Sequence, residues 1–101
     1  MTMKKQDMMR MRLEDVPQDK VFWCNDGRVL RNLKGLASAL KEMKKDIYSY
    51  HANAEKNDFS NWVRDVIGDV ALAYQLRKAK TRETAARCVL ERLEWLQERA
   101  Q

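Results

Sequence analysis

The sequence has few of the residues that build disulfide-bonded, collagen-like or low-complexity proteins. Its 101 residues include 3 Gly, 1 Pro, 2 Cys and a single His. The shortage of Gly and Pro excludes collagen-like and low-complexity architectures. Cys24 and Cys88 are too few for a secreted domain held by disulfides, and two free thiols suit a reducing cytosol.

Long apolar segments are also missing. The longest uncharged apolar stretch, residues 70–76, is far shorter than the roughly 18–20 residues of a membrane span. The basic, Met-rich residues 1–13 lack the apolar stretch of about 7–15 residues that a signal peptide needs. We therefore expect a soluble, cytoplasmic protein that makes no membrane contact.

What the sequence does contain is typical of one globular domain. Hydrophobic residues make up 45% and charged residues 35%, which argues against disorder throughout. The length suits a single domain. We expect residues 1–19 to be a flexible, Met-rich leader, because termini are usually loose unless docked, and residues 20–101 to be a single helical domain. A Met-rich arm that docks on a partner is the alternative for the leader.

Residues 21–30 predict a short β-ribbon. Two brief apolar segments flank an Asp-Gly turn at residues 26–27, where glycine supplies the positive φ that such turns need. An isolated hairpin with strands this short is marginally stable in water. We therefore expect it to lie on a helical surface, with Phe22 or Trp23 pressed into that surface.

Apolar residues at spacings of three and four predict about four helices after the ribbon. Asn32 is a suitable N-cap for the first, whose apolar stripe runs for about four turns to Ile47. Asp58 can cap the second, and Gly68 ends it as a glycine just past a helix C-terminus does.

Two more caps complete the predicted fold. Asp69 can cap the third helix, which reaches about residue 79, and Thr81 starts the last helix. The apolar stripes suffice for one hydrophobic core. The expected fold class is all-α in the main, a compact bundle of about four helices with a short N-terminal β-ribbon.

No catalytic set emerges from the residue types present. A Cys–His pair is arithmetically available, but Cys88 is expected on the inner side of a helix, while Cys24 beside the turn is expected to be more exposed. The chain has no nucleophile elbow, zincin helix or phosphate loop. We expect a protein that is not an enzyme, with no catalytic residues and no cofactor.

The best metal-ligating cluster is also weak. His51, Asp58 and Asp65 recur at intervals of seven, and no pair of Cys or His has zinc-site spacing. A helix cap explains Asp58 and a hydrogen-bonded loop position explains His51 more simply, so no metal site is expected. Asp65 and Asp69 are interpreted as surface charges.

The net charge of +5 makes nucleic-acid binding an alternative function. Basic side chains that neutralise phosphates give sequence-independent, salt-sensitive affinity. Residues 58–101, however, mix eight basic with seven acidic side chains, whereas a dedicated binder usually shows a cleaner basic stripe. The candidate phosphate contacts are Lys41, Lys44, Lys45, Arg77, Lys78, Lys80 and Arg82.

Residues 48–62 hold the densest group of aromatic and polar side chains. Tyr, Trp and Asn are typical of recognition surfaces, so this group is a candidate binding constellation. The alternative is a structural knot, in which His51 and the Asn side chains satisfy loop backbone groups. The constellation comprises Tyr50, His51, Asn57, Asp58 and Trp62.

Several segments together resemble a small uncharacterised domain that recurs in archaeal and some bacterial proteins. They are Phe22-Trp23, Asn25-Asp26-Gly27-Arg28, the run KNDFSNW at residues 56–62, and Gly68-Asp69 with the Leu72-Ala73 that follows. The similarity spans about residues 22–76, and residues 56–62 are its most specific part. It implies an accessory domain in a prokaryotic cytosol with no assigned activity, in which His51, Asn57, Asp58 and Trp62 are distinctive.

These observations predict a non-enzymatic module for protein interaction or regulation. The missing catalytic set, the aromatic–polar segment, and the Met and Trp residues near the ends favour this function. Its partner would be an unidentified protein or a second copy of the chain. The alternative is non-specific nucleic-acid binding through basic helix faces.

Overall fold

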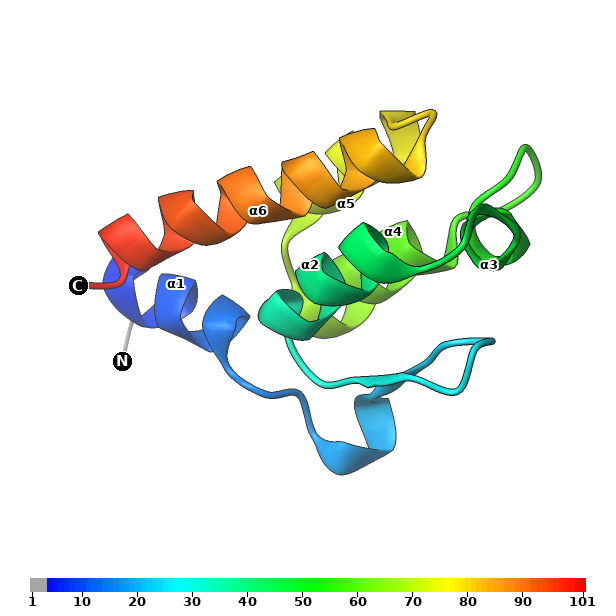
Figure 1. The fold of residues 1–101 in the computed structure, drawn as a ribbon. Helices are drawn as coiled ribbons and strands as arrows, with labels where there is room; N and C mark the ends of the chain where they lie inside the picture. The colour runs from blue at the N-terminus through cyan, green and yellow to red at the C-terminus, as the bar shows by residue number, and fades with distance from the viewer. Residues whose placement is uncertain (1–3) are drawn as a thin grey trace.

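A computed structural model describes residues 4–101 and shows a mainly helical chain, with 67% helix and one small antiparallel sheet (Figure 1). Within these residues there are six α-helices rather than the roughly four expected. In chain order the elements are α1 (Lys5–Leu13), a 3₁₀ turn (Gln18–Lys20), β1 (Phe22–Trp23), β2 (Val29–Leu30), α2 (Leu33–Glu42), α3 (Lys45–His51), α4 (Asp58–Trp62), a π-helical turn (Val63–Ile67), α5 (Val70–Lys78) and α6 (Arg82–Arg99).

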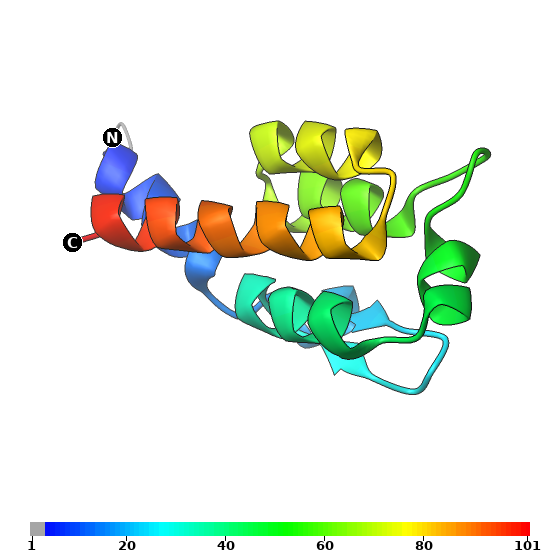
Figure 2. The same cartoon turned by 45° about the horizontal axis from the view of Figure 1, so that its top comes forward.

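The long helix α6 organises the molecule. Helices α1, α2 and α5 all pack against it, and α4 packs against α5 (Figures 1 and 2). In both views α1 and the C-terminus lie at one end, while the α3–α4 loop and the α5–α6 junction lie together at the other end. That second end holds the candidate site.

The core consists of the apolar stripes that the sequence predicts. On α2 the stripe residues Leu33, Leu36 and Leu40 are completely buried. Val89 and Leu96 of α6 are equally buried, whereas Leu90 beside them is exposed. Because α2 and α6 pack directly on each other, these stripes form one continuous core.

The predicted ribbon is confirmed. Phe22 pairs with Leu30 in antiparallel register, and Gly27 has a φ of +95° at the turn. The side chain pressed into the helices is Phe22, whose ring lies 5.1 Å from that of Phe59. Trp23 points the other way and is 73% exposed, as alternation along a strand requires.

The first predicted helix was wrong in its length. It ends at Glu42, and Met43 and Lys44 adopt extended backbone before α3 begins. The reason is a distant side chain: Arg82 Nη1 donates to the carbonyls of Leu40 and Lys41, at 2.7 and 2.6 Å. These carbonyls no longer need the amides of a further helical turn.

Three of the four predicted caps are confirmed. Side-chain oxygens of Asn32, Asp69 and Thr81 accept the backbone N–H three residues later, at 2.7, 3.1 and 3.1 Å. The fourth was wrong by one residue, because Asn57 rather than Asp58 caps α4, through Oδ1 at 3.0 Å from the Ser60 N–H. Asp58 is free for the contacts described below.

Gly68 ends the second predicted helical segment, as expected. Its φ of +85° is the left-handed conformation that favours glycine. The segment before it widens into the π-helical turn, and the Gly68 N–H donates to the Val63 carbonyl at 2.8 Å.

Most of the predicted leader lies within the described residues, and part of it is helical. Helix α1 packs on α6, where Gln6 and Arg10 donate to the carbonyls of Gln101 and Ala100, both at 2.9 Å. Residues 1–3 lie outside the described part of the chain. The division into a flexible leader and a domain at residue 20 stays a prediction.

None of the helices in residues 4–101 combines the length and the apolar character needed to cross a bilayer.

Candidate functional site

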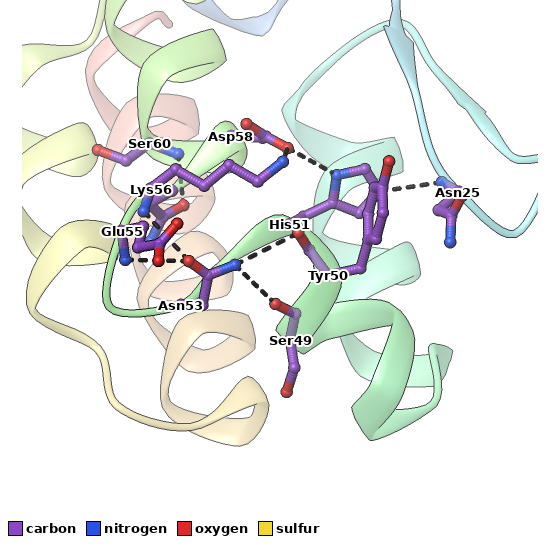
Figure 3. Close-up of polar contacts among 10 residues, drawn as sticks. Asn25, Ser49, Tyr50, His51, Asn53, Glu55, Lys56, Asp58 and Ser60 are labelled. Carbon is purple, nitrogen blue, oxygen red and sulfur yellow. Dashed lines mark hydrogen bonds and ion pairs between the residues drawn. The ribbon is translucent and has the colours of Figure 1, made fainter.

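His51, at the C-terminal end of α3, lies at the centre of a buried polar network (Figure 3). Its Nε2 accepts the backbone N–H of Asn25 at 2.9 Å, and its Nδ1 lies 3.0 Å from Oδ2 of Asp58. Since an acceptor nitrogen carries no proton, the ring proton of the neutral imidazole is on Nδ1 and is donated to Asp58. Neither nitrogen has a lone pair free for a metal or a substrate.

Aromatic rings enclose the same imidazole. The ring centroids of Phe22 and Phe59 lie 5.1 and 5.2 Å from it, and Tyr50 meets it edge-on at 4.9 Å. His51 is only 4% exposed. It therefore joins the ribbon, α3 and α4 through packing as well as through hydrogen bonds.

Asp58 connects this network to the surface. Its Oδ2 also accepts a hydrogen bond from Lys56 Nζ at 2.9 Å, and the Lys56 ammonium lies 4.9 Å from the centre of the Tyr50 ring. Burial raises the pKa of Asp58, but hydrogen bonds from Lys56 and His51 outweigh it and hold that pKa below its usual value. The carboxylate is therefore ionised at neutral pH.

Asn53 shapes the loop between α3 and α4. Its Oδ1 accepts the backbone N–H groups of Glu55 and Lys56, at 3.0 and 3.2 Å. Its Nδ2 donates to the Ser49 carbonyl at 3.0 Å, near the last turn of α3 (Figure 3). One amide side chain thus satisfies backbone groups on both sides of the turn, as asparagine often does in loops.

Three side chains tie α4 to its neighbours. Asn57 Nδ2 donates to the Leu76 carbonyl at 3.1 Å, and the buried Ser60 hydroxyl donates to the Ala73 carbonyl at 2.6 Å. Trp62 Nε1 donates to the carbonyl of Lys20 at 2.8 Å. These contacts fix α4 against α5 and against the chain that precedes the ribbon.

An open pocket of about 720 Å³ lies outside this network, between the α3–α4 loop, α4 and the end of α5. A smaller hollow of about 210 Å³ lies between α3 and the start of α6, and Tyr48 and Lys80 line both. The polar and charged side chains around the larger pocket include Asn53, Lys56, Asn57, Asn61, Arg77 and Lys80.

The charges around the two hollows are unequal. Lys56 is paired with Asp58, and Arg82 with Glu83 at 2.9 Å. Among residues 4–101 the remaining lining cations, Lys45, Arg77 and Lys80, form no ion pair, and Glu55 is the only other lining carboxylate. The combined hollow therefore has a surplus of positive charge.

The residues of the candidate binding constellation do not form one exposed surface: some are buried within the fold and others reach the surface. His51 and Trp62 are buried and used for hydrogen bonds within the fold. Asn57 lines the pocket while its amide caps α4, and Asp58 is half-buried at the edge of the network. Tyr50 is 54% exposed. Whether the set binds a ligand stays a prediction.

The candidate phosphate contacts do not form one set either. Arg82 caps the end of α2, and the Lys78 ammonium lies over the Tyr74 ring at 4.7 Å. Lys41 and Lys44 are exposed and do not line either hollow. Lys45, Arg77 and Lys80 do line the hollows. In the described part of the chain none of these three side chains donates to a carbonyl or lies over an aromatic ring.

Two further expectations were wrong. Cys24 is buried rather than exposed, since its chain segment lies on the helices, and burial raises the pKa of its thiol. Asp69 is not a surface charge: it is 1% exposed and accepts two hydrogen bonds from Arg92, at 2.7 and 3.0 Å, besides capping α5. Cys88 is half-buried, and burial raises its pKa as well.

Within the part of the chain that the structure describes, no group of three or more His, Cys, Asp or Glu side chains could hold a metal ion. The three residues weighed as the best candidate ligands, His51, Asp58 and Asp65, are not brought together there as such a group. His51 and Asp58 do meet, but for the structural purpose given above.

Sequence reasoning did not find the pocket itself. Asn53 and Asn61 belong to the aromatic–polar segment, but Arg77 and Lys80 come from the α5–α6 junction. Nothing in the spacing of these residues along the chain signals that they share a hollow, because the packing of α4 on α5 brings them together.

Comparison of the chain with protein-family models, curated proteins and solved structures gave no match. The resemblance to a small prokaryotic domain stays a prediction, as does everything it implies about the constellation.

Proposed function

We propose that this protein is a small, non-enzymatic interaction module that binds a partner protein at the pocket between the α3–α4 loop and the end of α5. The observation that carries the proposal is the pocket of about 720 Å³ with its adjoining hollow, formed by polar side chains from two distant segments.

Hydrogen bonds within the fold hold the wall of this pocket in place. Asn53 fixes the loop through both ends of its amide, and Asn57 connects the loop to α5. The pair formed by buried His51 and half-buried Asp58 anchors the same segment to the ribbon. A surface fixed before binding loses less conformational entropy when a partner docks, which favours recognition.

The chemistry of the described residues supports binding rather than catalysis. The single histidine uses both ring nitrogens within the fold. The pKa of each thiol is raised by burial, so neither Cys24 nor Cys88 has the thiolate character of a nucleophile. These features disfavour general-base and thiol catalysis at this site.

A pocket-filling variant tests the proposal. Asn61 is exposed on α4 and lines the pocket, so Asn61→Trp should obstruct it without disturbing the core. Gln97→Trp places the same side chain at an exposed position in the last turn of α6. The C-terminal end of α6 lies far from the α5–α6 junction (Figure 1). In affinity capture from cells of the source organism, the wild type and Gln97→Trp should retain a partner that Asn61→Trp loses.

Ala54→Trp, which fills the pocket from the exposed loop instead, covers the case in which the α4 variant is unstable. A set of bound proteins that neither pocket variant changes would contradict the proposal. The partner can also be a second copy of the chain, so self-association is measured by sedimentation. The pocket variants should weaken it and Gln97→Trp should not.

The rival function is general nucleic-acid binding. It would appear as affinity for DNA or RNA that falls steeply with salt. The use of Arg82 as a cap for α2 removes one of the seven predicted phosphate contacts and so weakens this alternative.

A further inference from the structure

We propose that the segment recognised by this pocket is an acidic stretch of polypeptide, whose carboxylates are held by Arg77 and Lys80. This inference rests on the proposed function and names the chemistry of the partner. It follows from three features of the pocket: its charge, its hydrogen-bonding groups and its lack of a stacking surface.

The charge of the pocket selects an anion. Arg77 and Lys80 lie on the wall formed by the end of α5, and Lys45 continues the positive charge into the adjoining hollow. Within residues 4–101 none of the three forms an ion pair, and the lining carboxylates are Glu55 in the pocket and Glu83, which is paired with Arg82, in the adjoining hollow. A concave site with surplus charge of one sign attracts ligands of the other sign and favours their encounter.

The free amide of the pocket, that of Asn61, favours a polypeptide. The Asn53 amide is fully used inside the fold, since its Oδ1 accepts two backbone N–H groups and its Nδ2 donates to two carbonyls. Asn57 likewise uses Nδ2 and Oδ1 for the backbone of α5 and α4. Asn61 is exposed, and its side chain has no hydrogen-bond partner in the described part of the chain. An amide offers both a donor and an acceptor, which matches the N–H and C=O groups of a docked main chain.

The aromatic residues argue against a nucleic acid as the occupant. Among residues 4–101, Tyr48 is the one aromatic residue that lines the pocket, and it is buried and stacked on Phe59 at 5.8 Å. Tyr50, whose ring centre lies 4.9 Å from the Lys56 ammonium, does not line the pocket. No aromatic face among the pocket-lining residues is therefore open for the base stacking on which single-strand binding depends.

The test compares charge variants of the whole chain. Arg77→Gln/Lys80→Gln removes the two proposed carboxylate contacts. Lys5→Gln/Lys34→Gln removes equal charge from exposed positions on α1 and on the start of α2. The probes are a labelled peptide of alternating aspartate and serine, the same peptide with asparagine in place of aspartate, and a single-stranded oligonucleotide of equal charge.

The acidic peptide should bind at low salt and shift the NMR signals of the Asn53 and Asn61 side-chain amides. Its affinity should fall about tenfold or more in Arg77→Gln/Lys80→Gln, because two charged hydrogen-bonding groups are lost, and should change little in the control variant. The asparagine peptide should bind far more weakly to the wild type.

Three outcomes would overturn the inference. They are the absence of peptide binding at low salt, equal losses in both double variants, and tighter binding of the oligonucleotide than of the acidic peptide at this site. The proposed function would survive each of them if pocket-filling still removed the captured partner. It would fail separately if pocket-filling left that partner bound.

Discussion

At the scale of single residues, His51 holds three segments together. It accepts a backbone N–H from the ribbon, donates to Asp58 on α4, and itself belongs to α3. The imidazole supplies a donor, an acceptor and a flat apolar ring in one buried side chain, a combination that no aliphatic side chain provides. The residue therefore stabilises the wall of the pocket without entering it.

His51→Ala should lower the free energy of unfolding by about 2–4 kcal/mol. It leaves a cavity among Phe22 and Phe59 and leaves the Asn25 N–H without its partner. Urea unfolding followed by circular dichroism measures the change, and Ser49→Ala, at an exposed position of α3, is the control. A variant within about 0.5 kcal/mol of the wild type would show that the network does not stabilise the fold.

Asp58 makes part of this stability depend on pH. Its pKa lies below the ordinary value of 3.8 in the folded protein, despite a burial effect that raises it, because Lys56 and His51 donate to the ionised form. A carboxyl group with a lowered folded-state pKa stabilises the fold above its unfolded pKa. That contribution is lost as the pH falls through the lower folded-state value.

Asp58→Asn should therefore reduce the free energy of unfolding by about 1 kcal/mol near neutral pH. The difference from the wild type should shrink as the pH falls below 3.8, the ordinary pKa of the carboxyl group. Denaturant titrations at several pH values measure it. Asp65→Asn serves as the control, since the Asp65–Arg64 pair is exposed and screened by water. A difference that is constant with pH would refute the assigned role of the carboxylate.

At the scale of elements, the end of α2 decides how the site is built. Arg82, the first residue of α6, occupies the carbonyls of Leu40 and Lys41 and so turns the chain out of the helix at Met43. Helix α3 then starts in a new direction and carries His51 to the ribbon (Figure 1). A continuous helix to Ile47 would not place the histidine there.

Arg82→Met keeps the apolar part of the side chain but removes these hydrogen bonds. The carbonyl of the buried Leu40 then lacks its partner, so we expect a loss of about 1–3 kcal/mol in the free energy of unfolding. Hydrogen exchange at Met43, whose N–H donates to Ala39, should also accelerate. Arg87→Met, at an exposed position of α6, should show neither effect, and the idea fails if both variants behave alike.

The same element shows where sequence reasoning succeeds and where it stops. The caps at Asn32, Asp69 and Thr81 are predictable because each side chain bonds a backbone group three residues away. The break after α2 is not predictable, since its cause lies about forty residues further along the chain. Apolar periodicity alone favoured one longer helix, and Met43 is indeed buried as the stripe requires.

The candidate site follows the same rule. The aromatic–polar segment stands out by composition, and the structure places its histidine and tryptophan inside the fold. The choice between scaffold and surface depends on which neighbours each side chain meets, and these come from the ribbon and from α5. Arg77 and Lys80 form one wall of the pocket because the helices pack together. No pattern in the sequence around these two residues predicts that wall.

At the scale of the whole molecule, the elements that line the pocket lie at the opposite end from α1 and the C-terminus (Figures 1 and 2). Helix α1 packs against the C-terminal part of α6, so that end is occupied by contacts within the chain. The α3–α4 loop and the α5–α6 junction are left facing outward at the other end. The net charge of +5 is thus partly concentrated where we place the binding surface.

The central claim is that this surface binds a protein. Isothermal titration of the captured partner against the wild type, Asn61→Trp and Gln97→Trp tests it most directly. We predict that the partner binds the wild type and Gln97→Trp with similar affinity, and binds Asn61→Trp about tenfold more weakly or not at all. Equal affinity for all three proteins would contradict the account.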